Sequence, residues 1–338
     1  MEVKAVITDI TCYLPKKIES NDDARLREKT GILRRHIAEK EELSSDMAVK
    51  AVEKLFAKGC NRSDIDYLLY CTQSPDYILP TTACILQDRL GLNKSCGAID
   101  YNLGCSGYIY GLSLAKDLIE TKQAKKILLV TVETYSKYIN ESDKAVRPLF
   151  GDAATATLIE GKLSEKEGME GFVIGTDGSG FEDLIVPVGG MRKRYQDTKQ
   201  EERVDKQGNK RSNLNLYMNG FNIMQFAMKV VPKTVKEILA KTKNKKEDID
   251  YYVFHQANKF MLDYLRKQCG LENRLYWNDV SEYGNTVSNS IPLALADTMK
   301  NKDQSLEKVM LVGFGVGLSW SGCLVNLGSI KEDSINEK

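Results

Sequence analysis

The stretch DIDYLLY at residues 64–70 decides how the chain is organised, because it returns 184 residues later as DIDYYVF at residues 248–254. A second pair of segments agrees with the first. KILLV at residues 126–130 resembles KVMLV at residues 308–312, at an offset of 182 residues. Two agreeing offsets are typical of an internal duplication, in which both copies keep the same order of elements. We therefore expect one architecture built twice.

Each half alternates short β-branched runs with helical patterns. Residues 125–132 form an apolar run typical of a strand, whereas apolar residues between Ile109 and Ile119 recur every three or four positions. This alternation is typical of an α/β fold. We divide the chain into an N-terminal half, residues 1–165, and a C-terminal half, residues 166–338. The second half includes a polar stretch near residues 192–211, with eight basic and four acidic residues, which predicts a surface excursion or flexible lid.

The composition narrows the class of protein. Its 338 residues are 42% hydrophobic and 28% charged, and 48 Lys and Arg against 47 Asp and Glu leave a net charge of +1. Such a balance gives no general attraction to nucleic acid or to an anionic membrane. No apolar run approaches the roughly 18 residues that span a bilayer, and the first residues lack a leader pattern, so we expect a cytoplasmic protein without a membrane span. Eight cysteines without a CxxC pair indicate reduced thiols, and two histidines argue against a His-rich metal site.

Cys105 is a candidate nucleophile. It lies in the sequence NLGCSG, between an apolar run that ends near Tyr101 and a helical pattern that begins near Gly107. A thiol at a helix N-terminus is close to free backbone N–H groups and to the positive end of the helix dipole, both of which favour thiolate. The alternative interpretation is a small buried cysteine beside a turn.

Two polar residues in the second half occupy positions related to the first half by the repeat. His255 follows the apolar run and opens the sequence HQAN, and the offset of 184 relates it to Cys71. Asn285, in YGNT, precedes another helical pattern and lies 180 residues after Cys105. Each alone is ambiguous, since a lone histidine is usually structural and Gly-Asn is a common turn. The repeat nevertheless predicts that both halves present these residues to one cleft.

The glycine-rich sequence GFGVG at residues 313–317 follows a predicted strand and superficially resembles a dinucleotide-binding loop. The residues after it, 318–325, have the pattern of another strand, whereas a phosphate-binding loop opens a helix. We therefore interpret it as a turn whose backbone N–H groups face an oxyanion.

Together these motifs resemble β-ketoacyl-acyl carrier protein synthase III, within the thiolase-like condensing enzymes. The resemblance covers nearly the whole chain. It implies a duplicated thiolase-like α/β fold with five layers in the order α-β-α-β-α, usually in a homodimer. The motifs that carry it are KTGI at 29–32, RHIA at 35–38, GCSG at 104–107, FGD at 150–152, HQAN at 255–258, GNT at 284–286, and GFGVG at 313–317 before Trp320.

The resemblance also implies an activity in fatty acid biosynthesis. Cys105 is expected to take an acyl group from a thioester, after which malonyl-acyl carrier protein loses carbon dioxide and attacks the acyl-enzyme. The products are a 3-oxoacyl-acyl carrier protein, carbon dioxide, and free carrier or coenzyme A. The backbone N–H groups of Cys105 and Val316 are expected to hold the oxyanion, and Nε2 of His255 and the amide of Asn285 to donate to the enolate. Acyl-coenzyme A or carrier phosphopantetheine enters as substrate, and no cofactor or metal is implied.

Three departures from the family pattern affect these expectations. Val316 occupies the position of the middle glycine of the loop, although its N–H can still donate. Arg25 and Lys144 stand where members that use acetyl-coenzyme A stack the adenine between tryptophan and arginine. Phe260 stands at a basic docking position, near Lys259. We therefore hypothesise a carrier-bound or unusual primer from a specialised pathway.

The resemblance implies further contacts to substrate, carrier and partner subunit. Leu79 is expected to reach the partner subunit's pocket, and basic residues around the HQAN helix to dock the acyl carrier protein, although a solvated helix face is equally compatible with them. The full set of expected substrate and carrier contacts is Arg25, Lys29, Thr30, Leu79, Lys144, Asn258, Lys259, Arg266 and Lys267.

Three alternative functions remain open at this point. A thiolase-fold acyltransferase would pass the acyl group from Cys105 to an amine or hydroxyl without decarboxylation. A cysteine hydrolase would use the same three residue types, but we identify no residues that activate water. A non-catalytic protein that binds acyl carriers is the third alternative.

Overall fold

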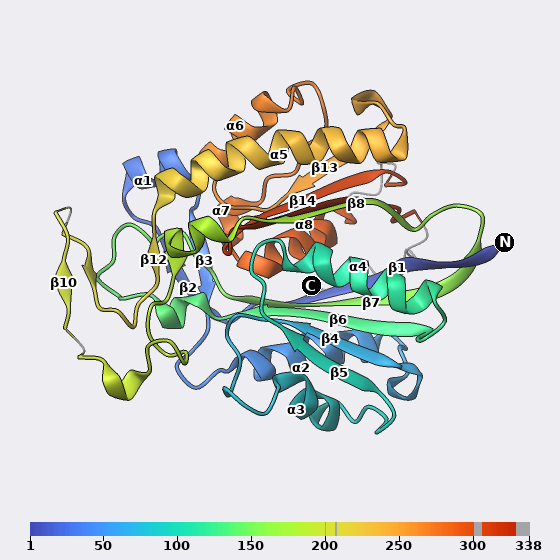
Figure 1. Ribbon diagram of the computed structural model, residues 1–338, viewed down its shortest axis with the longest axis horizontal. Helices are drawn as coiled ribbons and strands as arrows, with labels where there is room; N and C mark the ends of the chain where they lie inside the picture. Colours follow the sequence, from blue (N-terminus) through green and yellow to red (C-terminus); the bar gives the residue numbers. More distant parts are fainter. Residues whose placement is uncertain (200, 207, 301–305, 329–338) are drawn as a thin grey trace.

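The computed structural model describes residues 1–199, 201–206, 208–300 and 306–328, and Figure 1 shows them stacked in five layers. Helices α2 and α3 cover the outer face of a five-stranded sheet, and α5 and α6 cover the outer face of a four-stranded sheet. Helices α4 and α8 form the layer between the sheets. The α/β architecture with five layers is as predicted.

The helices and strands have the following bounds. The helices are α1 Ala24–Thr30, α2 Ser44–Ala57, α3 Thr82–Arg89, α4 Gly107–Glu120, α5 Gly220–Thr242, α6 Lys259–Gln268, α7 Val280–Tyr283 and α8 Ser290–Thr298. The strands of the two large sheets are β1 Glu2–Tyr13, β4 Tyr67–Cys71, β5 Gly97–Tyr101, β6 Lys126–Glu133, β7 Ala153–Ser164, β8 Met169–Thr176, β13 Tyr251–Phe254, β14 Val309–Gly315 and β15 Ser319–Val325. Three small two-stranded sheets contain β2 Lys17–Ser20, β3 Arg34–Ile37, β9 Leu184–Ile185, β10 Arg203–Val204, β11 Lys210–Arg211 and β12 Tyr217–Met218.

The two large sheets repeat one topology. The first has the order β1-β7-β6-β4-β5 and the second the order β8-β15-β14-β13. In each, the two repeated motifs form neighbouring parallel strands, β4 beside β6 and β13 beside β14. Beyond them, each strand runs antiparallel to the one before it: β7 beside β6 and β1 beside β7 in the first sheet, and β15 beside β14 and β8 beside β15 in the second. The duplication predicted from the sequence offsets is therefore present in the strand order and direction.

The central helix α4 has apolar positions that serve both sheets. Ile109, Leu112, Ala115 and Ile119 are fully buried, and the helix contacts β1 and β6 of the first sheet and β14 and β15 of the second. A helix enclosed in this way is apolar over most of its surface rather than along one stripe. The ends of α4 and α8 therefore lie where the two halves meet.

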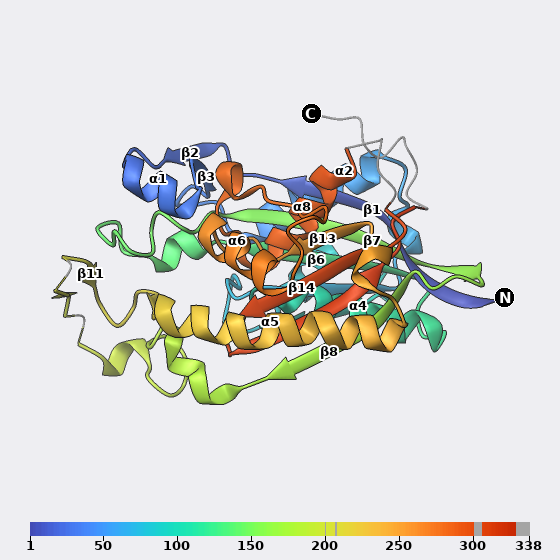
Figure 2. The same cartoon turned by 90° about the horizontal axis from the view of Figure 1, so that it is seen from above.

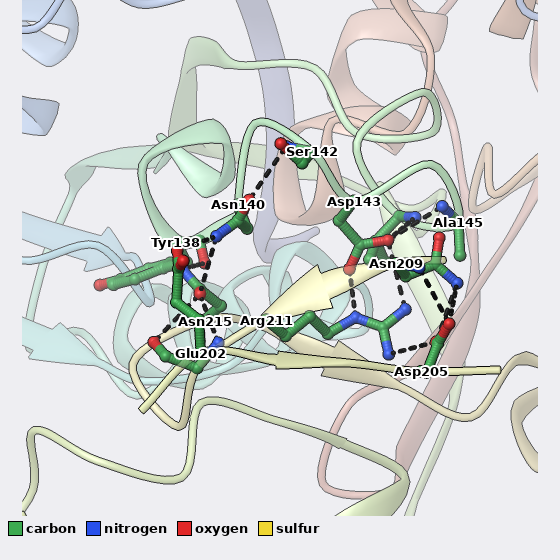
Figure 3. A network of polar contacts seen from close by, with 12 residues as sticks. Tyr138, Asn140, Ser142, Asp143, Ala145, Glu202, Asp205, Asn209, Arg211 and Asn215 are labelled. Atoms are coloured by element: carbon green, nitrogen blue, oxygen red, sulfur yellow. Dashed lines mark hydrogen bonds and ion pairs between the residues drawn. The ribbon is translucent and has the colours of Figure 1, made fainter. Parts of the chain in front are cut away.

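The polar excursion between β8 and α5 carries the small hairpin β10–β11 and lies against the segment after β6. Figure 3 shows its main contact, the ion pair of Arg211 with the fully buried carboxylate of Asp143. Asp205 lies 3.4 Å from the same guanidinium and accepts a hydrogen bond from the side chain of Asn209. Arg211 thus anchors this surface excursion. Within the described residues, no helix is long and apolar enough to cross a membrane.

Candidate active site

Cys105 lies in the turn between β5 and the N-terminus of α4, as predicted. Only 4% of its surface is exposed. The turn is fastened to the opposite half of the molecule through its neighbour Ser106, whose Oγ lies 2.7 Å from Oγ of Ser319. Ser321 Oγ also donates to the carbonyl of Ser106, at 2.9 Å. Strand β15 of the second half therefore positions the thiol of the first.

The end of β14 passes directly over Cys105, and its glycines make that approach possible. A Cβ on Gly313 would lie 2.7 Å from the carbonyl oxygen of Cys105, and a Cβ on Gly315 would lie 2.9 Å from its Sγ. Val316, the next residue, packs against Gly104, where a Cβ would meet Val316 Cγ1 at 2.5 Å. Any side chain on Gly313 or Gly315 would collide with Cys105.

Opposing effects act on the Cys105 thiol. Burial raises its pKa, and the nearby Glu133 carboxylate raises it further. The backbone N–H groups of Cys105 and Val316 lower the pKa. The net shift is upward, so the resting thiol is protonated and needs a base before it can act as a nucleophile.

His255 follows the last residue of β13 and is 2% exposed. Its backbone N–H donates to the carbonyl of Val312 at 2.8 Å, which ties it to β14, and its ring packs edge-on against Phe314. Nδ1 lies 2.7 Å from Oγ of Ser290. Burial lowers the pKa of the imidazole to about 3, so the ring is neutral near pH 7.

Asn285 is held in the loop that leads to α8. Its backbone N–H donates to Leu149 at 2.8 Å, and its carbonyl accepts from Gly151 at 3.0 Å. The side-chain Oδ1 accepts from the N–H of Val287 at 2.9 Å, which leaves the NH₂ group of the amide to donate elsewhere. Val287, although β-branched and buried, has a φ of 56°. Strain of this kind is typical of functional sites.

The same loop is joined to the first half through residues that the sequence analysis did not single out. Ser288 donates to the buried carboxylate of Glu133 at 2.9 Å, and Thr131 donates to Asn289 Oδ1 at 2.8 Å. Glu133 also accepts the N–H of Gln73 at 3.1 Å. Burial raises the pKa of Glu133 to about 8 against the effect of these donors.

A cavity of about 710 Å³ opens beside Val316 and the Cys105 turn. The carboxamide of Gln73 stands in its wall, where it accepts from the Tyr135 hydroxyl and donates to Asn102 Oδ1 at 2.8 Å. Apolar and aromatic side chains form much of the remaining lining. The lining residues include Tyr77, Ile78, Leu184, Val186, Val188 and Leu216.

The predicted contact residues fall into different environments. Arg25, Lys29 and Lys259 line one surface cavity of about 350 Å³ together with Phe260. This cavity lies where α1 contacts α6, and Figure 2 shows the two helices beside each other. Gly31, which ends α1, leaves no room for a Cβ because Lys259 Cβ would lie 2.4 Å away.

Of the other predicted contact residues, some have side chains that are hydrogen-bonded within the protein and some are exposed to solvent. Thr30 donates to the carbonyl of Leu26, Asn258 caps α6 by accepting from Met261, and Arg266 donates to three carbonyls of the following turn. The exposed ones are Lys144, Lys267 and Leu79, the last with 78% of its surface exposed.

Comparison with known proteins gives consistent matches. The family model described as 3-oxoacyl-[acyl-carrier-protein (ACP)] synthase III matches residues 99–178, and the model of its C-terminal part matches residues 239–327. A Clostridium perfringens protein named beta-ketoacyl-[acyl-carrier-protein] synthase III is 36% identical over 326 residues, which cover 93% of this chain and 97% of that protein.

Two solved structures extend the likeness to three dimensions. A crystal structure of a 3-oxoacyl-(acyl-carrier-protein) synthase III superimposes with a TM-score of 0.92 at 45% identity, covering 96% of this chain and all of the other. A 3-oxoacyl-(acyl-carrier protein) synthase from Burkholderia xenovorans LB400 does so with a TM-score of 0.86 at 37% identity, covering 97% of this chain and 95% of the other.

Proposed function

Because this chain belongs to the β-ketoacyl-[acyl-carrier-protein] synthase III family, we propose that it condenses an acyl thioester primer with malonyl-acyl carrier protein, with loss of carbon dioxide. It is an acyltransferase that acts through an acyl-cysteine intermediate. One observation supports this assignment above the others. The end of β14 covers the Cys105 thiol, and the same strand and the loop before α8 bring His255 and Asn285 to the boundary between the halves.

The first half-reaction loads the primer. Nε2 of His255 takes the proton of the Cys105 thiol, and the sulfur attacks the thioester carbonyl. The backbone N–H groups of Cys105 and Val316, which already lower the pKa of the sulfur, donate to the oxyanion that forms. The primer's thiolate takes the thiol proton from Nε2 as it leaves, which returns His255 to the neutral form that its lowered pKa favours.

The second half-reaction makes the carbon–carbon bond. When the anionic malonyl group is bound, Nε2 of His255 takes up one solvent proton. Loss of carbon dioxide from the malonyl thioester leaves an enolate, whose oxygen accepts from the free NH₂ group of Asn285 and from the protonated Nε2 of His255. The carbanion attacks the acyl-cysteine and expels the Cys105 thiolate, which takes the proton from His255. One solvent proton is consumed over the cycle, as the loss of neutral carbon dioxide from a carboxylate requires.

The finer assignments extend this proposal to primer, carrier and partner. The cavity beside Val316, whose lining includes Ile78, Leu184 and Leu216, suits the acyl chain, and Arg25, Lys29 and Lys259 suit the phosphates and acidic surface of an acyl carrier protein. Because Arg25 and Lys144 stand where members that use acetyl-coenzyme A stack the adenine between tryptophan and arginine, we infer a carrier-bound or otherwise unusual primer. The exposed apolar residues near Leu79 suit contact with a second subunit in a homodimer.

Intact-mass measurement tests the reaction directly. Wild-type protein and Cys105→Ala are offered acyl-coenzyme A and acyl-carrier thioesters, and then malonyl-acyl carrier protein. A Cys105-dependent mass gain, discharged with release of carbon dioxide and a 3-oxoacyl product, is the expected result. An acyl-enzyme that only an amine or hydroxyl acceptor discharges would instead show an acyltransferase without decarboxylation. Saturable loading by acetyl-coenzyme A at micromolar concentration would contradict the unusual primer.

A further inference from the structure

The Ser290 hydroxyl lies between two groups that both attract its single proton. Its Oγ is 2.9 Å from the carbonyl oxygen of Val287 and 2.7 Å from Nδ1 of His255. A serine hydroxyl has one proton to donate and two lone pairs to accept with, whereas a carbonyl oxygen only accepts. Ser290 is 2% exposed, so its contacts are within the protein rather than with bulk water.

The two neutral forms of His255 fit this arrangement unequally. With the proton on Nδ1, the ring donates to Ser290 and Ser290 donates to Val287, so both close contacts are hydrogen bonds. With the proton on Nε2, Nδ1 and the Val287 carbonyl are both acceptors, and one hydroxyl proton cannot serve both. One contact would then join two lone pairs inside the protein, which costs free energy.

We propose that Ser290 is a positioning residue that keeps the proton of neutral His255 on Nδ1, so that Nε2 is the nitrogen that exchanges a proton with Cys105. The tautomer of His255 is inferred from hydrogen-bond geometry alone. The role of Nε2 in exchanging a proton with Cys105 rests on the proposed function. The hydrogen bond made by one ring nitrogen of a histidine sets the protonation of the other. Ser290 thereby gives His255 an unprotonated Nε2 in the resting enzyme.

This assignment links the two half-reactions through one atom. Nε2 begins as an acceptor, so it can take the Cys105 thiol proton and pass it to the leaving thiolate, and in the second half-reaction it carries the N–H that donates to the enolate. Ser290 accepts from Nδ1 throughout, and no proton leaves that side of the ring. When the condensation releases the Cys105 thiolate, the proton returns from Nε2 to sulfur and the resting tautomer is restored.

Nitrogen-15 NMR of histidine-labelled protein tests the tautomer directly, because the chain has two histidines. His36 provides an internal reference, since its Nδ1 lies 2.6 Å from the carbonyl of Pro15 and must therefore carry a proton. The His255 signals are those that vanish in His255→Ala. In wild-type protein we expect a protonated Nδ1 and a pyridine-type Nε2. In Ser290→Ala we expect the proton to shift toward Nε2, and in Ser290→Thr to remain on Nδ1.

The half-reactions test the catalytic consequence. In Ser290→Ala, acylation of Cys105 should slow about 10-fold or more, because less of the base is in its active tautomer. Carbon dioxide release by enzyme that is already acylated should change much less, since a neutral Nε2–H also donates to the enolate. Ser290→Thr should restore acylation. Thr298→Val, which removes another buried hydroxyl bonded within α8, should change neither rate.

Different experimental outcomes would overturn the role of Ser290 and the proposed condensing function. A protonated Nε2 in the resting wild-type protein, or spectra and half-reaction rates unchanged in Ser290→Ala, would overturn the role of Ser290. Absence of condensation in a wild-type protein whose Nδ1 is protonated would overturn the proposed function and leave the tautomer standing, because the spectra require no turnover.

Discussion

At the scale of single residues, burial has opposite consequences for Cys105 and His255. It raises the pKa of the thiol and lowers the pKa of the imidazole to about 3, so both groups are neutral in the resting protein. A buried thiolate–imidazolium pair is therefore disfavoured in the resting protein. It becomes accessible when the oxyanion or the enolate forms from bound substrate. The backbone N–H groups of Cys105 and Val316 stabilise the oxyanion of the acylation step and do not themselves titrate.

The buried His255 should make stability depend on pH. Its pKa is about 3 in the folded protein and roughly 6.5 when unfolded, so the unfolded state binds the proton first as pH falls. Stability that is present above pH ~6.5 is then lost toward pH 3, by about 2 kcal/mol between pH 7 and pH 5. Urea unfolding of wild type and His255→Asn at both pH values measures this difference.

Comparison with the variant is needed because other buried groups act in the opposite direction. The pKa values of Glu133, Asp152 and Asp279 are raised by burial to about 8, 6 and 7, so their protonation stabilises the folded state as pH falls. They are common to both proteins and cancel in the difference. Equal pH dependence in wild type and variant would show that His255 is not buried in its neutral form.

Asn285→Asp separates the two half-reactions. The aspartate keeps an oxygen to accept from Val287 N–H, so the loop should hold its shape, but it has no NH₂ group for the enolate. We expect acylation of Cys105 to continue and decarboxylation to fall ~10²-fold or more. Acyl-enzyme mass and carbon dioxide release measure the two steps. A parallel loss of both would mean that Asn285 shapes the site rather than serving the enolate.

At the scale of elements, the loop between α7 and α8 belongs to one half of the chain but is fixed by the other. Its backbone is bridged to the segment that contains Phe150, and its side chains bond to Thr131 and Glu133 of β6. Gly151 is required at the bridge because a Cβ there would lie 2.3 Å from the carbonyl of Tyr283. The position of Asn285 is therefore a property of the contact between elements.

Glu133→Gln tests this connection. Above its raised pKa of about 8, the carboxylate accepts from Gln73, Ser74 and Ser288, and an amide in its place would turn N–H groups toward these donors. We expect the free energy of unfolding to fall by about 2–3 kcal/mol. Loss of the negative charge should also lower the pKa of the Cys105 thiol, so that alkylation by iodoacetamide reaches half its maximal rate at lower pH.

Ser288→Ala is the matched control for that variant. It removes one donor to Glu133 and keeps the charge, so it should destabilise the protein by ~1 kcal/mol and leave the pH dependence of alkylation unchanged. If Glu133→Gln also left that profile in place, the carboxylate would have no electrostatic influence on Cys105.

At the scale of the whole molecule, the two halves share one central layer and should unfold together. Trp277 and Trp320 both lie in the second half, so tryptophan fluorescence reports on that half alone, whereas far-ultraviolet circular dichroism reports on both. We expect the two signals to change at the same urea concentration. An earlier change in fluorescence would show that the second half unfolds independently and that α4 does not couple the sheets.

The sequence predicted the repeated parts of the molecule best. The two offsets indicated the strand pairs β4 with β13 and β6 with β14, and the pattern around Cys105 predicted the turn before α4. It could not predict Ser290 or Glu133, because their partners lie 35 and 155 residues away and one buried hydrogen bond has no periodic signal. Nor could it predict the left-handed Val287, since β-branched residues normally avoid that conformation.

The covering of Cys105 by β14 also bears on how the protein is made. During synthesis on the ribosome the N-terminal half emerges first, with its thiol but without the strand that covers it or the imidazole that deprotonates it. A nascent chain of this length has a thiol that neither His255 nor the N–H of Val316 can yet serve. The acylation site is complete only when residues 309–315 have been translated and have paired with β13, so the reaction cycle cannot begin before both halves of the chain exist.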